Sequence, residues 1–353
     1  MTSISSYGQY QRLQTETMRL QRQQMDLQIQ SSSGKKGTAI GDLGVEATHS
    51  LNMRAVTGQL KTYKENISQV GLYASAMDTA MTRMGELLND LRGEYARMSN
   101  DLTANGPTGT PNTTYLNDLG KRGLEEMQSL LNTQVEGRYI FAANDIHTAP
   151  VPDVSKLISA FASEMSHNLP VATPAEDIIN NMKAYVGQSN TPVPGQAYFP
   201  SSTGLYSTSL SSAGGPLKAR VDVDRDIHYG VRADASVFQD MMRAFATAAT
   251  ITHSPDHPET YKALLKDGAD TTAASVVNLS NEVGRLGITR KQISDLDKKH
   301  DTVTTSLKLA LGDVEDVDMA EVAIKLQQSN TALEATYRII ASMKNLSLVN
   351  FLS

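Results

Sequence analysis

Apolar residues recur at helical spacing along one uninterrupted stretch of the chain, from Met53 to Leu102. Their steps alternate between three and four residues, which gives a mean period of about 3.5 and places an apolar seam on one side of a helix that winds around a partner. No proline interrupts the stretch. A helix of this length measures roughly 75 Å at about 1.5 Å per residue. The pattern therefore predicts a long coiled helix within an elongated, rod-shaped protein.

The same spacing returns between residues 272 and 312, up to a predicted break at Gly312-Asp313. We expect this second long helix to be the partner of the first, because small residues such as Gly71 and Gly85 beside the first seam allow a close approach. Residues of both helices form the expected rod seam: Leu60, Ile67, Met77, Leu88, Leu91, Leu279, Val283 and Leu286.

The two ends of the chain carry further amphipathic helices, predicted over residues 4–30 and 317–352. Gly34 is expected to follow the C-terminus of the first helix, and residues 37–47 are expected to form a loop or spoke. In the first, three leucines recur every seven residues, and a second apolar stripe of Met18, Met25 and Ile29 lies about 140° away around the helix. Two separated stripes are typical of a helix placed between neighbours. The residues expected to contact other subunits are Leu13, Leu20, Leu27, Met319, Val322, Leu326, Leu333, Ile340, Leu346, Leu348 and Phe351.

The middle of the chain has a mixed pattern. It predicts helices over residues 113–134, 154–167, 175–186 and 234–251, a break at 105–111, a short strand at 138–142 and a β-hairpin or two short strands within 221–231. Eight of the 12 prolines fall between residues 145 and 230, which marks an inserted, exposed region.

These elements predict a mainly α fold, an elongated coiled-coil or helical-bundle rod with a smaller insertion. We expect three parts: a terminal helical assembly domain of residues 1–45 and 315–353, a coiled-coil rod domain of residues 46–144 and 232–314, and an inserted mixed α/β or β domain of residues 145–231.

Composition narrows the function classes. The net charge of −6 and the absence of a Lys/Arg cluster argue against binding of nucleic acid or of an anionic membrane. No apolar run approaches the 18 or so residues of a membrane span. The first twenty residues lack the pattern of a Sec-type signal peptide, and the chain has no cysteine. A cytosolic protein and an exported one that avoids stray disulfides both fit these features.

Two weak motifs for ligand binding are present. Gly34-Lys35-Lys36 is similar to part of a phosphate-binding loop, but residue 29 is Ile where that loop requires Gly. His253 and His257 are four residues apart, yet the prolines between and after them interrupt the helix that would place both imidazoles on one face. We therefore expect loop or helix-start roles here, with neither a metal nor a cofactor.

Motifs of known enzyme classes are missing from the sequence, which has no nucleophile elbow, zincin pair or zinc-type Cys/His set. Asp316 and Asp318 are interpreted as caps of the last helix and not as an acid–base pair. The sequence therefore predicts no catalytic residue and no enzymatic activity.

Several short motifs, taken in order, resemble the flagellin superfamily and within it the hook–filament junction type. The first is Ser32-Ser33-Gly34-Lys35, which follows a Gln-rich helix. The next are Gln134 to Ala142 with Asp145 and Thr148-Ala149-Pro150, then Tyr229-Gly230-Val231 before Phe238-Gln239-Asp240. The last are Asp316 to Ala323, Leu333-Glu334-Ala335 and Leu346 to Leu352. Flagellin itself usually has a proline-containing element near its C-terminus, where this chain has Ser342-Met343-Lys344-Asn345. A second departure is Leu43, where many relatives have an acidic residue.

The resemblance implies a structural subunit of the bacterial flagellum that connects hook and filament by self-assembly in a ring or helix through its terminal helices. It implies type III export without a cleaved signal, an extracellular location, and termini that order on assembly. The implied partners are further copies of the chain, flagellin, a hook-side hook-associated protein and a FlgN-type export chaperone at residues 333–352. The alternative is flagellin forming the filament itself, and a distant alternative is a coiled-coil partner-binding module.

Overall fold

The computed structural model describes residues 2–105, 112–168, 173–187, 205–207, 210 and 217–352, with side chains from residue 8 to 101 and up to residue 342. In this part the chain is mainly helical, and its strands form two short antiparallel hairpins. The predicted mainly α fold with a small mixed insertion is confirmed. The chain divides into two compact units, here called the terminal unit (Met1–Thr62 with Lys299–Ser353) and the central unit (Tyr63–Lys298).

Two long helices contain most of the residues that were predicted to form long coiled helices. Helix α2 spans Ala47–Asn105, close to the predicted range, and helix α8 spans Pro258–Glu315. The prediction that the second helix begins near residue 272 is wrong: Pro258 occupies its first position, where a proline's fixed φ and missing N–H are tolerated. The predicted break at Gly312-Asp313 is also wrong, since the helix continues to Glu315.

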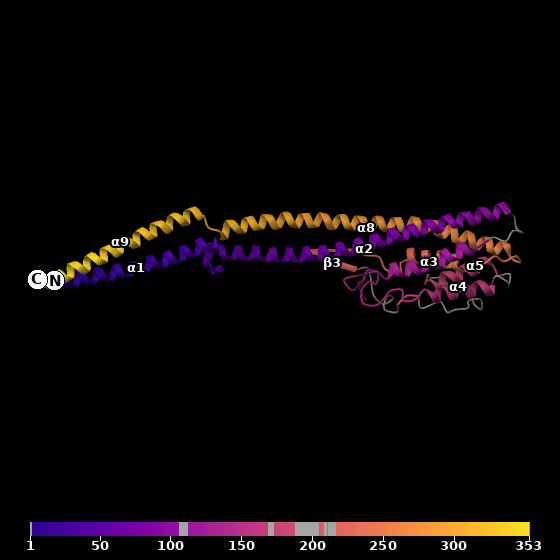
Figure 1. Cartoon of the computed structure of the whole chain (residues 1–353), viewed down its shortest axis with the longest axis horizontal. Helices are drawn as coiled ribbons and strands as arrows, with labels where there is room; N and C mark the ends of the chain where they lie inside the picture. Colours follow the sequence, from indigo (N-terminus) through magenta and orange to yellow (C-terminus); the bar gives the residue numbers. More distant parts are fainter. Residues whose placement is uncertain are drawn as a thin grey trace. The chain divides into compact units, whose positions relative to one another are not determined.

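Within the central unit, α2 and α8 run antiparallel (Figure 1), and glycines of α2 lie beside larger side chains of α8. A Cβ on Gly71 would lie 4.0 Å from Ile293 Cγ2, and a Cβ on Gly85 would lie 3.7 Å from Leu279 Cδ2. The salt bridge between Arg290 and Asp78 (2.6 Å) follows the same register. The predicted pairing of the two long helices is therefore confirmed, with glycines at the contact.

The centre of this unit is helix α7 (Ser236–Thr250), which is buried along nearly its whole length. Helix α3 (Thr114–Leu131) crosses it closely because Gly120 and Gly123 leave room. A Cβ on Gly120 would lie 2.3 Å from the backbone nitrogen of Ala249, and one on Gly123 would lie 2.3 Å from the Phe245 ring. This crossing needs glycine at both positions.

Tyr95 connects α2 to both α7 and α8. Its hydroxyl donates a hydrogen bond to the Ala244 carbonyl at 2.9 Å, and its ring lies where a Cβ on Gly268 would be. Burial raises the pKa of Tyr95, so this hydroxyl stays protonated. The long helices and the central helix are thus joined by one buried side chain.

The insertion contains the elements predicted for it. Helices α4 (Ser155–Asn168) and α5 (Ala175–Tyr185) and the hairpin of β3 (Leu217–Asp222) and β4 (Arg225–Tyr229) match the sequence expectations. The strand predicted at 138–142 is shorter: β2 (Arg138–Tyr139) pairs with β1 (Gln134–Val135). Most of residues 188–215 lie outside the described residues. Of the predicted break at 105–111, Asn105 is the last residue of α2 and the rest lies outside the described residues.

The insertion shares one core with the helices around it. Phe161 of α4 and Tyr185 of α5 are fully buried in the same cluster as Phe238 and Phe245 of α7. Glu164 of α4 is also fully buried, and its carboxyl accepts hydrogen bonds from Asn168, Asn181 and Tyr185 at 2.7, 2.7 and 2.8 Å. These bonds offset the cost of burying the carboxyl.

The terminal unit contains helix α1 (Thr2–Ser33), the short 3-10 helix η1 (Ile40–Glu46), the first part of α2, the last part of α8 and helix α9 (Met319–Leu352). Gly34 ends α1 with a φ of +68°, as predicted for a residue after a helix C-terminus. The segment 37–47, predicted as a loop or spoke, contains η1 over residues 40–46, so it is not an irregular loop.

Candidate assembly interface

In the terminal unit, α1 and α9 pack side by side and run in opposite directions (Figure 1). Gln21 Nε2 donates to Tyr337 Oη at 2.8 Å, and Gln24 Nε2 donates to Asn330 Oδ1 at 2.5 Å. The least exposed positions recur every three or four residues along both helices: Leu13, Thr17, Leu20, Gln24 and Leu27 on α1, and Val322, Leu326, Ser329, Leu333, Thr336 and Ile340 on α9. The two helices thus share one narrow seam within a single chain.

This seam contains most of the residues that the sequence assigned to contacts between subunits. Leu13, Leu20 and Leu27 face Val322, Leu326, Leu333 and Ile340 across it. Met319 instead is 48% exposed at the start of α9. Leu346, Leu348 and Phe351 belong to α9, but their side chains lie outside the described residues.

Other large apolar side chains of the pair remain exposed. On α1 these include Met18, Met25 and Ile29, which are 48%, 58% and 40% exposed. They form the second stripe of the sequence pattern, on the side of α1 away from α9. On α9 the exposed apolar residues are Met319, Ile324, Tyr337 and Ile339. The second stripe was the sequence signal for this surface, although the predicted contact residues did not include it.

A buried carboxylate lies at the base of the pair, where α8 ends. Glu315 Oε1 accepts hydrogen bonds from Ser50 Oγ (2.5 Å) and Arg54 Nε (2.7 Å), and Oε2 accepts one from Arg54 Nη2 (2.7 Å). Lys35 Nζ lies 3.5 Å from Oε2 and also contacts Asp316. Hydrogen bonds from Arg54 are the main reason that the pKa of Glu315 falls to about 2, although burial acts in the opposite direction.

Backbone hydrogen bonds join the same segments. Lys36 N donates to Glu315 O at 2.7 Å, and Val317 N donates to Gly34 O at 3.0 Å, around a β-bridge between Lys35 and Asp316. Asp318 accepts hydrogen bonds from the amides of Ala320 and Glu321, so it caps α9 as predicted. Asp316 pairs with Lys35 instead of capping the helix.

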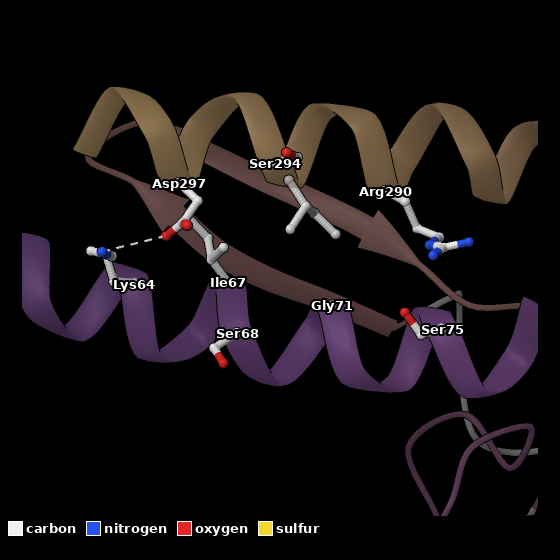
Figure 2. Close-up of a pocket in the computed structure, with 9 residues that line it drawn as sticks. Lys64, Ile67, Ser68, Gly71, Ser75, Arg290, Ser294 and Asp297 are labelled. Atoms are coloured by element: carbon white, nitrogen blue, oxygen red, sulfur yellow. Dashed lines mark ion pairs between the residues drawn. The ribbon is translucent and has the colours of Figure 1, made fainter. Parts of the chain in front are cut away.

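The residues predicted for the rod seam are placed as follows. Leu60 of the terminal unit is buried, as are Ile67, Met77, Leu88, Leu91, Leu279 and Leu286 of the central unit, and Val283 is half-buried. Between α2 and α8 there is also a shallow groove of about 520 Å³ (Figure 2). Its lining includes Gly71 and three serines, and the Lys64–Asp297 ion pair (3.7 Å) lies at one end. Small side chains on both helices account for this gap in the seam.

The two histidines considered from the sequence lie in the proline-containing segment that precedes α8. His257 directly precedes α8, and the His253 ring packs edge-on against Tyr261 at 5.2 Å between ring centres. Among the described residues, no three His, Cys, Asp or Glu side chains gather as a metal ion would require. None of the described helices combines the length and the apolar character needed to cross a membrane.

The comparison with protein families and the comparison with solved structures both find similar proteins. Residues 270–352 match the family described as the bacterial flagellin C-terminal helical region, a range that covers part of α8 and all of α9. The solved structure of a Vibrio parahaemolyticus protein, assigned as a flagellar hook-associated protein, matches with a TM-score of 0.47 and 14% identity over 78% of this chain and 100% of that chain. The comparison with curated proteins gives no match. The family match supports the resemblance first noticed in the sequence motifs: residues 270–352 of this chain are similar to the C-terminal helical region of bacterial flagellin.

Proposed function

We propose that this chain is the subunit of the hook–filament junction, which connects the hook to the flagellin filament by packing and not by chemical turnover. The observation that carries this proposal is the exposed apolar surface of the α1–α9 pair, here called the outer surface: Met18, Met25, Ile29, Met319, Ile324, Tyr337 and Ile339. Full burial of one such side chain contributes about 1.5–3 kcal/mol, so covering several half-exposed ones favours association.

Two features of the pair support ordering on assembly. Its intrachain seam is only one row of side chains wide, and four of the central positions on the two helices are Thr17, Gln24, Ser329 and Thr336. A seam with so many polar positions gives the pair little stability of its own. We therefore expect residues 5–30 to become fully ordered only when neighbouring subunits cover the outer surface.

The finer assignments follow from the family resemblance. In this proposal the chain is exported through the flagellar type III apparatus and functions outside the cell. Its partners are further copies of the chain, flagellin and a hook-side hook-associated protein. A FlgN-type chaperone holds residues 333–352 before export, which keeps the apolar part of α9 from aggregating. The predicted seam residues and the three-part division of the chain belong to the same proposal.

Flagellin is the competing function within the family. The departures near Ser342–Asn345 and the motif at Arg138–Ala142 favour the junction type. Copy number separates the two functions, because a junction needs a short ring of subunits and a filament needs many more copies. We expect quantitative immunodetection on purified flagella to give the smaller number.

Deletion of the gene tests the junction role directly. We expect cells without filaments that still secrete flagellin into the medium, because the filament would have no base on which to grow. Cells that secrete no filament subunit at all would indicate that this chain is the flagellin. Normal filaments and motility would reject both functions.

Hydrogen exchange tests the ordering of the ends. We expect amides of residues 5–30 to exchange rapidly in the dilute chain and slowly in isolated flagella. Strong protection of these amides in the dilute chain would contradict the proposal. A discrete, fully helical dimer of the purified chain would favour a coiled-coil partner-binding module instead.

A further inference from the structure

Four side chains that are far apart in the sequence meet around one buried carboxylate: Lys35, Ser50, Arg54 and Glu315. We call this cluster the Glu315 corner. Ser50 and Arg54 come from the start of α2, Lys35 follows α1, and Glu315 ends α8. The side chain of Glu315 is 5% exposed, and its two oxygens accept the donors of all three partners. The Lys36–Glu315 and Gly34–Val317 backbone bonds lie directly beside it.

We infer that Glu315 is a positioning residue that, in its ionised form, fixes the base of the α1–α9 pair on the first turns of α2. The carboxylate acts as a latch, because loss of its charge weakens every one of these bonds at once. Its role in presenting the outer surface to a neighbour rests on the proposed function, whereas the latch itself does not.

The geometry favours a latch over an ordinary surface ion pair. Exposed pairs contribute little, since water competes for both partners. Here the carboxylate is buried and bound by two guanidinium N–H groups in a forked arrangement, which gives both strength and a fixed direction. Removing the charge leaves Arg54 and Lys35 facing a neutral group, and removing one partner of a buried pair is costly.

A fixed base of the α1–α9 pair also reduces the number of residues that must become ordered during assembly. The chain turns from α1 into η1 at residues 34–39 and from α8 into α9 at residues 316–318. Because the latch fixes both turns, the two helices leave it as neighbours, and their seam can close without a search over relative orientations. Only the parts of α1 and α9 beyond the latch then depend on other subunits.

Other charged groups surround the latch, and most of them make a contact of their own. Lys36 Nζ donates to Asp313 O at 2.9 Å and lies 3.8 Å from Glu46 of η1. Asp316 pairs with Lys35, and Asp42 accepts the Ala39 amide at the start of η1. From α2, exposed His49 precedes Ser50, and from α9, Asp318 caps its own helix. Glu315 is the buried carboxylate among these acidic groups.

Hydrogen exchange of the full-length chain across pH tests the latch. The readout is the protection factor of the Lys36 and Val317 amides, which corrects for the intrinsic pH dependence of exchange. In the unaltered chain we expect protection above pH 4.5 that declines as the pH falls toward 2, because the unfolded corner then binds a proton that the folded corner excludes.

Glu315→Gln keeps the shape of the side chain and removes its charge. We expect it to lower protection of the two amides by about tenfold or more at neutral pH and to remove the acid transition. Glu321→Gln is the matched control, since Glu321 is exposed and pairs with Lys325 one turn along α9. It should leave both protection and transition unchanged, as should His49→Ala.

Arg54→Lys provides a second variant that keeps the charge and loses the fork. We expect intermediate protection with the acid transition retained, a pattern that general misfolding would not give. Unchanged protection of central-unit amides shows that the variants fold. A Glu315→Gln chain with the protection and acid transition of the unaltered chain would overturn the inference.

Filament attachment in cells that express Glu315→Gln connects the latch to assembly. We expect at least tenfold fewer attached filaments with normal secretion of the variant. If Glu315→Gln lowers the protection of the two amides in hydrogen exchange but leaves filament attachment unchanged, the latch has no role in assembly. If gene deletion leaves filaments normal, the proposed function fails while the exchange result still decides whether the latch exists.

Discussion

The two units of the molecule bury their apolar residues to very different extents. The central unit surrounds α7 with side chains from several helices, and Phe245, Tyr95 and Met81 are completely buried in it. In the α1–α9 pair of the terminal unit, a single seam buries Leu27, Val322 and Leu333, while Met25 nearby is 58% exposed. The central unit has a core of its own, and the pair has only part of one.

This difference separates folding from assembly. Side chains that contact partners on several sides contribute to the stability of the isolated chain. Apolar side chains exposed on a narrow pair contribute little until another surface covers them. Mutations in the two units should therefore affect different measurements, and the following predictions test that separation from the largest expected effect to the smallest.

Phe245→Ala should have the largest effect on stability. Its ring is fully buried between α7 and Gly123 of α3, so truncation leaves a cavity. We expect the free energy of unfolding of the central unit to fall by about 3–5 kcal/mol. Denaturant unfolding followed by circular dichroism measures this loss, and a change below about 1 kcal/mol would contradict the description of this core.

Tyr185→Phe should destabilise the same unit by less. The substitution removes the 2.8 Å hydrogen bond to the buried Glu164 carboxyl and keeps the ring. We expect a loss of about 1–3 kcal/mol in the same unfolding measurement. Tyr115→Phe is a matched control on an exposed side chain, and it should change stability by less than about 0.5 kcal/mol.

Gly120→Ala tests the close crossing of α3 and α7. Its new methyl group would meet the Ala249 backbone, so we expect a loss of about 1–3 kcal/mol. Gly284→Ala on α8 is the matched control, because nothing lies within 4 Å of its Cβ position. There alanine's higher helix propensity should raise stability by up to about 1 kcal/mol. The same sign for both variants would contradict the crossing.

Met25→Ser should have the smallest effect on the isolated chain. Because Met25 is exposed, we expect its unfolding free energy to change by no more than about 0.5 kcal/mol. Filament attachment in cells should nevertheless fall, because the serine cannot supply apolar contact to a neighbour. Arg22→Ser, at another exposed position of α1, is the control and should leave attachment near normal. Equal filament attachment for the two variants would show that the outer surface does not contact other subunits in the assembly.

Local patterns made much of the fold predictable. The alternating spacing of apolar residues from Met53 to Leu102 located α2, and alternation between Val221 and Val231 located the second hairpin. Gly34 and Asp318 marked helix ends for reasons of backbone geometry and hydrogen bonding. Predictions failed where local composition disagreed with tertiary packing. The start of α8 was missed, and in this part of the helix Gly268 makes room for Tyr95 of α2.

The candidate assembly surface was only partly predictable. Periodicity identified both stripes of α1, but it could not say which one α9 covers. In the structure the stripe of Leu13, Leu20 and Leu27 faces α9, and the stripe of Met18, Met25 and Ile29 remains exposed. The Glu315 corner left no sequence signal, since its partners lie at positions 35, 50 and 54.

By itself the sequence determined the helices, the turns that end them and the family motifs, because these depend on neighbouring residues and on fixed spacing. Only the tertiary structure decided which apolar stripe is free, which glycines are required by close packing and which carboxylate is buried. Those properties depend on what approaches a residue from distant parts of the chain. The burial and the protonation state of a side chain depend on these distant neighbours, and the periodicity of apolar residues within one helix carries no information about them.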